Sequence, residues 1–158
     1  MKFDKNTRAF IALLKAGLWE QDVRLLQYND IDYEAIMRMA EEQSVVGLVT
    51  AGLEKVSDVT VPKEMLLQFI GSTLQIEQQN KAMNEFVARL IELLRKNDVY
   101  TLLVKGQGIA QCYERPLWRS CGDVDLFLSG SNYEKAKEVL IPLATDIEKE
   151  YLLLKHLA

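Results

Sequence analysis

The hydrophobic pattern of the chain changes once, near Asn97, and this change restricts the fold more than any other feature of the sequence. Before it, apolar residues recur three and four positions apart, which is the spacing of helices with one buried face. After it, residues 99–104 form an aliphatic run without helical gaps, as in a buried strand, and residues 123–128 are expected to form a second strand that Ser129 and Gly130 close. The pattern predicts an α+β protein in which a helical region, residues 1–97, packs on a small α/β region, residues 98–158.

The predicted helices differ greatly in length. Pro62 suits the first position of a helix, and one apolar seam then continues to Asn97, which predicts a single long helix. Gly17 is expected to end the first helix. The tail from Ile147 to Ala158 fits either a strand or a helix. Residues 45–53 are expected to form either a helix or a turn-rich apolar segment. The other helices are predicted over residues 7–16, 20–27, from Asp30 or Asp32 to Glu42, 109–114, and from Ser131 or Asn132 to Leu140.

The charge balance and the residue counts argue against several functional classes. The chain has 19 Lys and Arg against 23 Asp and Glu, a net charge of −4 and a pI near 5.1, so an extensive nucleic-acid surface is not expected. Two cysteines and one histidine are too few for a disulfide framework or a zinc cluster. No apolar run approaches the ~20 residues of a membrane-spanning helix, so we expect a cytoplasmic protein with no membrane partner.

Two acids open the second predicted strand. Alternate side chains of a strand share a face, so Val124, Leu126 and Leu128 should point into a core, while Asp123 and Asp125 point the other way. Two carboxylates on one face can hold a divalent cation such as Mg²⁺ or Mn²⁺, and Mg²⁺ completes its shell with water and substrate phosphate. A solvated strand start is the structural alternative. A similar pair, Asp30 and Asp32, precedes a helix and is explained by capping.

Cations surround these acids in the sequence. Gly106 and Gly108 follow the first strand and allow backbone N–H groups to approach an anion, and Lys105 adds a positive charge. A plain tight turn between strand and helix is the alternative. Arg119 lies in the connection that leads to the acids, and a triphosphate with its metal needs this mixture of charges. Trp118, next to Arg119, is either a packing residue or a platform on which a base stacks.

The segments Leu103–Gly106 and Arg119–Leu128 together resemble the nucleotidyltransferase superfamily that includes DNA polymerase beta. They are most similar to a branch of uncharacterised bacterial nucleotidyltransferase-like proteins with an L-K-G turn and an R-x-x-G-D-x-D-L strand. The resemblance implies that Lys105 and Gly106 bind the nucleotide phosphates and that Asp123 and Asp125 are catalytic and bind Mg²⁺ or Mn²⁺. Arg119 matches the branch motif, and a role for it in binding phosphate is our own hypothesis.

The sequence departs from the superfamily pattern in two places. Gln107, which we also count among the nucleotide-binding positions, stands where the superfamily usually has a small residue. The superfamily also has a third acid on a later strand, and His156 resembles the K-H-L segment that precedes this strand in the branch. We therefore expect an N-terminal portion of a longer protein with an incomplete metal site. Asp146, Glu148 and Glu150 are the acids that could substitute.

Three functions are compatible with these residues. The first is Mg²⁺-dependent transfer of a nucleoside monophosphate from an NTP to an unknown acceptor hydroxyl, with pyrophosphate as the leaving group. The second is a catalytically inactive nucleotidyltransferase-like domain that binds nucleotide or only a partner. The third is a glycosyltransferase with a D-x-D motif and a nucleotide-sugar donor, which is less favoured because those acids usually end a strand.

Overall fold

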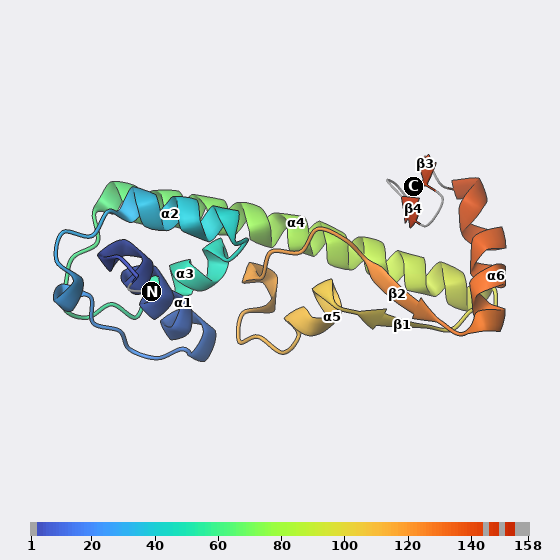
Figure 1. The fold of residues 1–158 in the computed structure, drawn as a ribbon. Coiled ribbons are helices and arrows are strands. Elements are labelled where there is room, and N and C mark those ends of the chain that lie inside the picture. The colour runs from blue at the N-terminus through green and yellow to red at the C-terminus, as the bar shows by residue number, and fades with distance from the viewer. Residues whose placement is uncertain (1–2, 144–145, 149–150, 154–158) are drawn as a thin grey trace. The chain divides into compact units, whose positions relative to one another are not determined.

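The computed structural model of the chain describes residues 3–143, 146–148 and 151–153 (Figure 1). Helices alternate with two small antiparallel sheets, which confirms the predicted α+β class. Short 3₁₀ turns cover Leu26–Tyr28, Pro116–Trp118 and Ile141–Leu143. The helices and strands are α1 (Lys5–Trp19), α2 (Tyr33–Glu42), α3 (Val46–Leu53), α4 (Lys63–Lys96), β1 (Thr101–Val104), α5 (Gly106–Ala110), β2 (Asp125–Leu128), α6 (Gly130–Leu140), β3 (Asp146–Glu148) and β4 (Tyr151–Leu153).

The chain forms two compact units, and we describe each by itself. The helical unit comprises residues 1–80 and 110–121, and the strand unit comprises residues 81–109 and 122–158. The sequence-based division at residue 97 follows the change of hydrophobic pattern, whereas the division by compactness falls within α4. The segment 110–121, which leads from α5 toward β2, belongs to the helical unit. We call it the connecting segment.

In the helical unit, α1 and α3 approach so closely that two glycines have no room for a side chain. A Cβ on Gly17 would overlap the carbonyl oxygen of Leu48, and a Cβ on Gly52 would overlap that of Leu13. Gly17 therefore lies inside α1, and the prediction that it ends the helix is wrong. The left-handed residue Glu20, at φ 49°, forms the C-cap instead.

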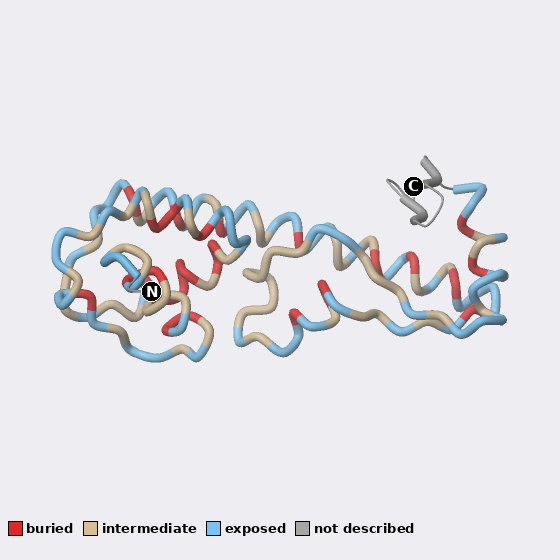
Figure 2. The backbone as a smooth tube through the Cα atoms, in the orientation of Figure 1, coloured by how far each residue is buried: buried red, intermediate tan, exposed pale blue. Residues whose placement is uncertain are grey.

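The core of the helical unit lies between these helices and the first half of α4 (Figure 2). It includes Leu13 of α1, Ile36 of α2, Val49 of α3 and Phe69 of α4, each of which is fully buried. This arrangement agrees with the predicted helical periodicity. The predicted helix over residues 20–27 is wrong, because this stretch is a loop with a single 3₁₀ turn at its end.

The carboxylate of Asp58 holds this loop in place. It accepts hydrogen bonds from the backbone N–H groups of Leu25, at 2.8 Å, and Leu26, at 3.0 Å. Desolvation alone would raise the pKa of Asp58, but these two hydrogen bonds outweigh it and lower the pKa below its usual value. Contacts with a residue over thirty positions away thus replace the helical hydrogen bonds that the local pattern favoured.

In the strand unit, β1 and β2 are neighbours and pair in an antiparallel register. Val124, Leu126 and Leu128 pack against a buried cluster that includes Leu90 and Leu94 of α4, whereas Phe127 is exposed. The residues of β2 and its approach that face the core are therefore the three that the alternation predicted. Pairing begins at Asp125, so Asp123 precedes the strand. β3 and β4 form a separate hairpin, which assigns these parts of the tail to strands, while Glu150 and His156 lie outside the described residues.

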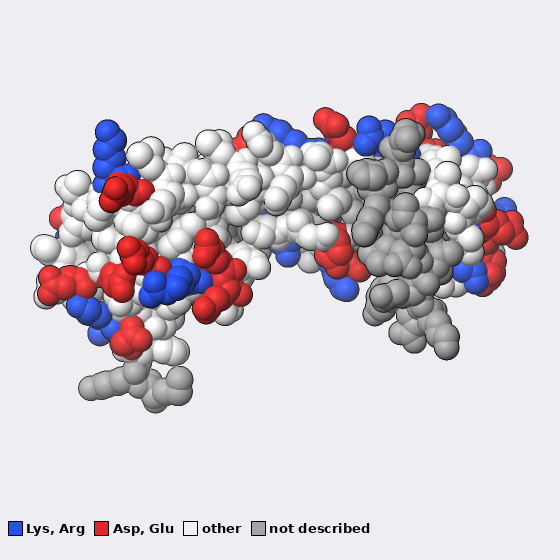
Figure 3. Space-filling model, turned by 90° about the horizontal axis from the view of Figure 1, so that it is seen from above, with Lys and Arg blue, Asp and Glu red and all other residues white. Residues whose placement is uncertain are grey.

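The surface carries charges of both signs. On the face shown in Figure 3, Lys and Arg side chains lie among Asp and Glu side chains. Within the part of the chain that the structure describes, no helix has the length and apolar character needed to cross a membrane. Although α4 has 34 residues, its exposed side is rich in polar residues.

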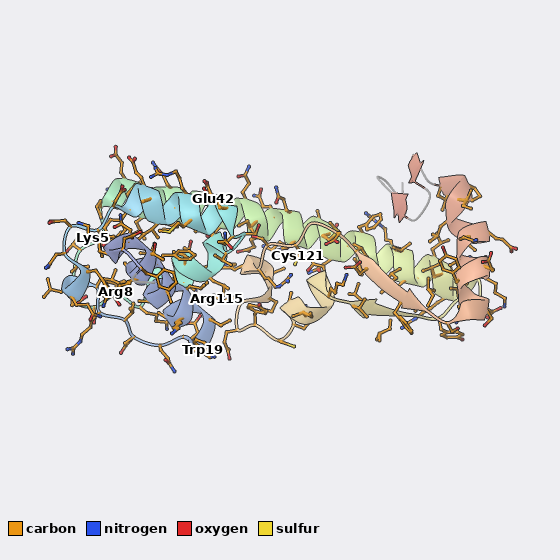
Figure 4. All side chains as sticks on the ribbon, viewed as in Figure 1. Lys5, Arg8, Trp19, Glu42, Arg115 and Cys121 are labelled. Carbon is orange, nitrogen blue, oxygen red and sulfur yellow. The ribbon has the colours of Figure 1, made fainter. Side chains whose placement is uncertain are left out.

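Arg115, labelled in Figure 4, is part of an ion-pair network that links the connecting segment to the ends of α1 and α3. The guanidinium of Arg115 places Nε 2.9 Å from Oε1 of Glu20 and Nη2 2.8 Å from Oε2 of Glu54. Lys55 Nζ lies 2.9 Å from Oε2 of Glu20. The hydrogen bond from Lys55 and the neighbouring Arg115 lower the pKa of the Glu20 carboxyl, although desolvation opposes them.

Replacement of Glu20 by Gln should therefore destabilise the helical unit in a pH-dependent way. Because the folded-state pKa of Glu20 is lowered, its contribution is present above the ordinary value near 4.5 and is lost as the pH falls through the folded-state pKa. We expect Glu20→Gln to reduce the free energy of unfolding by about 1 kcal/mol at pH 7, because the pair is partly solvated. Urea denaturation at pH 7 and at pH 3 measures this difference.

The exposed Glu42 of the same unit provides the control. Glu42→Gln should leave the free energy of unfolding within about 0.5 kcal/mol of the wild-type value at both pH values. A Glu20→Gln effect that persisted at pH 3 would contradict the role of the Glu20 charge.

Candidate functional site

The register of β1 and β2 brings the predicted turn next to one of the predicted acids. Val104, the last residue of β1, pairs with Asp125, the first residue of β2. Lys105 directly follows Val104, and its Nζ lies 3.5 Å from Oδ2 of Asp125. The Lys105 side chain is 73% exposed and the Asp125 side chain 31%. The Lys105 ammonium and the Asp125 carboxylate, which are twenty residues apart in the sequence, are thus neighbours at a solvent-accessible position.

The backbone of the turn differs from the sequence-based expectation. Lys105 itself has a left-handed conformation, at φ 51°, and no glycine of the chain has a positive φ. A left-handed backbone is uncommon for a non-glycine residue, and Glu20 adopts it as well. Gly106 lies close to another part of the backbone: a Cβ there would be 3.1 Å from the carbonyl oxygen of Asp123, so a side chain would require a shift of a few tenths of an ångström. The absence of a side chain on Gly106 lets the turn lie against the backbone of Asp123.

The two acids have different surroundings. Asp123 is exposed and precedes β2, whereas Asp125 is half-buried within the strand pair. Among the described residues, no group of three or more His, Cys, Asp and Glu side chains could hold a metal ion. Mg²⁺ is usually bound by one or two carboxylates together with water and substrate phosphates. Metal binding by Asp123 and Asp125 therefore stays a prediction, and it requires further ligands from water or a nucleotide.

Gln107 and Arg119 have surroundings that the sequence pattern did not indicate. Gln107, in the first turn of α5, is only 3% exposed, so its side chain faces the interior. Arg119 belongs to the connecting segment, where its Nη1 donates to Sγ of Cys121 at 3.0 Å and its guanidinium lies 5.8 Å from the ring centroid of Tyr113. Desolvation lowers the pKa of Arg119, but the contacts with Cys121 and Tyr113 outweigh it, and the guanidinium keeps its charge.

Sequence reasoning missed Asn80, which fixes the connecting segment. This α4 residue is 1% exposed, and its amide donates to the carbonyl oxygens of Leu117, at 2.8 Å, and Arg119, at 2.7 Å. A signal was present, because Asn80 stands between Ile76 and Met83 on the apolar seam of α4. A polar residue at a seam position indicates a buried hydrogen bond.

Comparison with known families identifies the kind of protein. The model of a family described as an uncharacterised nucleotidyltransferase matches residues 29–154, which is most of the chain. The chain belongs to this family. The matched range contains the turn at Lys105 and both acids, and it confirms the resemblance predicted from them. No curated protein and no solved structure matches the chain. The roles of the individual residues in this nucleotidyltransferase family member remain predictions.

Proposed function

We propose that this protein transfers a nucleoside monophosphate group from an NTP to an acceptor hydroxyl in a reaction that depends on Mg²⁺ or Mn²⁺. The observation that carries the proposal is the pairing of Val104 with Asp125, which places Lys105 beside a half-buried carboxylate. Family membership supports nucleotidyl transfer in general. It also makes glycosyl transfer the weaker interpretation of the two acids.

Each residue of the turn has a role in this proposal. Lys105 exchanges its ion pair with Asp125 for one with the triphosphate, since an exposed pair at 3.5 Å is only weakly favourable. Gly106 lets the phosphates lie close to the backbone. Because the side chain of Gln107 is buried, its contribution is limited to its backbone N–H. Arg119 belongs to the helical unit, and its role in nucleotide binding is kept as a hypothesis that rests on its place in the family motif.

The acids have the complementary role. Asp123 and Asp125 would hold the divalent cation, which when bound neutralises charge on the phosphates. In the transfer, the acceptor oxygen forms a bond to the α-phosphorus while the bond from that phosphorus to the pyrophosphate oxygen breaks. Pyrophosphate leaves with that electron pair, and the acceptor loses its proton to a base. Lys105 stabilises the negative charge that collects on the leaving group.

A binding domain without turnover is the second candidate. The specific observation in its favour is that the described residues contain no cluster of three metal-ligating side chains. Two carboxylates can support nucleotide binding with substrate phosphate as a further ligand, but a missing base or second metal ligand would slow transfer by ~10²–10⁴.

Calorimetry tests the part of the proposal that both candidates share. Titration of an NTP with Mg²⁺ into the wild type should give saturable binding, and the double variant Asp123→Asn with Asp125→Asn should bind at least about 10-fold more weakly. The difference should disappear when EDTA removes the metal from both proteins. Equal affinity of the two proteins in the presence of Mg²⁺ would show that Asp123 and Asp125 do not take part in nucleotide binding.

A further inference from the structure

The helical unit contains a cavity of about 190 Å³ beside the connecting segment. Tyr113, Trp118 and Arg119 of the connecting segment line one wall. The link between α2 and α3 also contributes to the lining, through Gln43 and Ser44 among others. At roughly 30 Å³ for each water molecule, the volume corresponds to about six waters, which is room for one small planar ring system.

The wall formed by the connecting segment is held from several directions. Asn80 bonds the carbonyl oxygens on both sides of Trp118, those of Leu117 and Arg119. The indole Nε1 of Trp118 donates to Oε2 of Glu77 at 3.1 Å, and the guanidinium of Arg115 lies 4.4 Å from the Trp118 ring centroid. Such anchoring fixes the cavity before any ligand enters and reduces the entropy lost on binding.

The chemical groups that line the cavity indicate which class of ligand it binds. It offers two aromatic rings, a guanidinium that has only hydrogen-bond donors, the Gln43 amide and the Ser44 hydroxyl. None of the described residues that line it carries a carboxylate, which disfavours a cationic amine. Aromatic side chains and Arg planes together bind unstacked nucleobases, whose edges present acceptors to Arg. A planar ring rich in acceptors is therefore the best match.

We infer that this cavity binds the nucleobase of a nucleotide, with Tyr113 and Trp118 against the ring and Arg119 donating to its acceptor edge. The inference rests on the proposed function for the class of ligand, since a nucleotidyltransferase handles nucleotides. It does not depend on the acids, because base binding needs neither metal nor triphosphate.

Trp118 fluorescence provides a direct readout of the cavity. The chain has two tryptophans, so the variant Trp19→Phe leaves Trp118 as the only one. In this background AMP, GMP, CMP and UMP are titrated separately in EDTA, so that no divalent cation contributes to the binding. At least one of them should quench the emission saturably. Tyr113→Ala should weaken that binding about 10-fold or more, and Tyr113→Phe, which keeps the ring, should stay within about 3-fold of the parent.

Matched variants separate the cavity from the site at the acids. Tyr133→Ala removes an exposed tyrosine of the strand unit and should not change the affinity. Asp98→Asn, which removes one exposed negative charge of the strand unit, should not change it either. If Tyr113→Ala fails to fold, Ser120→Phe, which fills the cavity from the connecting segment, should abolish the quenching instead.

Two outcomes would overturn the inference: quenching that rises linearly with all four nucleotides, or an unchanged affinity in folded Tyr113→Ala or Ser120→Phe. Failure of the proposed function looks different. In that case the double Asn variant would bind NTP with Mg²⁺ as well as the wild type does, while the metal-free quenching by nucleoside monophosphates would persist.

Discussion

Replacement of Gly52 by Ala is expected to lower the free energy of unfolding of the helical unit by about 3 kcal/mol or more. The new Cβ would overlap the backbone carbonyl oxygen of Leu13, and a backbone atom cannot rotate away as a flexible side chain can. α1 and α3 would have to separate, which disturbs the core around Leu13 and Val49. Thermal unfolding followed by circular dichroism should show a midpoint more than about 10 °C below that of the wild type.

Gly71→Ala is the matched control, because the same methyl group is added in the same unit. Gly71 is an exposed position of α4, and a Cβ there would meet nothing within 4 Å. Alanine is the better helix former, so this variant should be more stable than the wild type by up to about 1 kcal/mol. A Gly52→Ala protein with a wild-type midpoint would show that α1 and α3 do not pack through these glycines.

Asp125→Asn is expected to reduce nucleotidyl transfer by at least about 100-fold, provided that the wild type turns over. Loss of one of two carboxylates weakens both the hold on the cation and the placement of the phosphates, and such losses usually cost several kcal/mol at the transition state. The fold should survive, because the 3.5 Å pair with Lys105 is largely solvated. Labelled NTPs incubated with Mg²⁺ and a cell extract, followed by detection of labelled acceptor and pyrophosphate, measure the transfer.

Asp98→Asn controls for the loss of one negative charge. Asp98 is exposed in the strand unit and has φ 56°, a left-handed conformation that Asn tolerates well. Its transfer rate should match that of the wild type. Equal rates for Asp125→Asn and the wild type would place the metal elsewhere, and no transfer by the wild type under any condition would favour the binding domain.

Much of the candidate site could be predicted from the sequence, because its signals are local. A run of β-branched and aliphatic residues predicted the strand Thr101–Val104, and alternation predicted that Leu126 packs inward while Phe127 is exposed. The turn and the two acids also sufficed to indicate the family that most of the chain matches. Their individual roles in binding and catalysis stay predictions.

Other features depend on contacts between distant residues and could not be predicted in this way. Gly17 was expected to end a helix, but α3 passes so close to α1 that a glycine is needed within the helix. Residues 20–27 were expected to be helical, but the carboxylate of Asp58 binds their N–H groups. Asn80 was overlooked because its hydrogen-bond acceptors are almost forty residues away.

The sequence by itself determined most of the elements of this protein, the inward side of β2 and the residue types of the candidate site, since periodicity and turn chemistry depend on neighbours along the chain. Only the tertiary structure decided which of these residues meet. The strand register places Lys105 beside Asp125, and Asn80 holds the wall of the Trp118 cavity. The physical reason is that a hydrophobic pattern specifies which face is buried, whereas the atoms across that face are set by packing between distant segments.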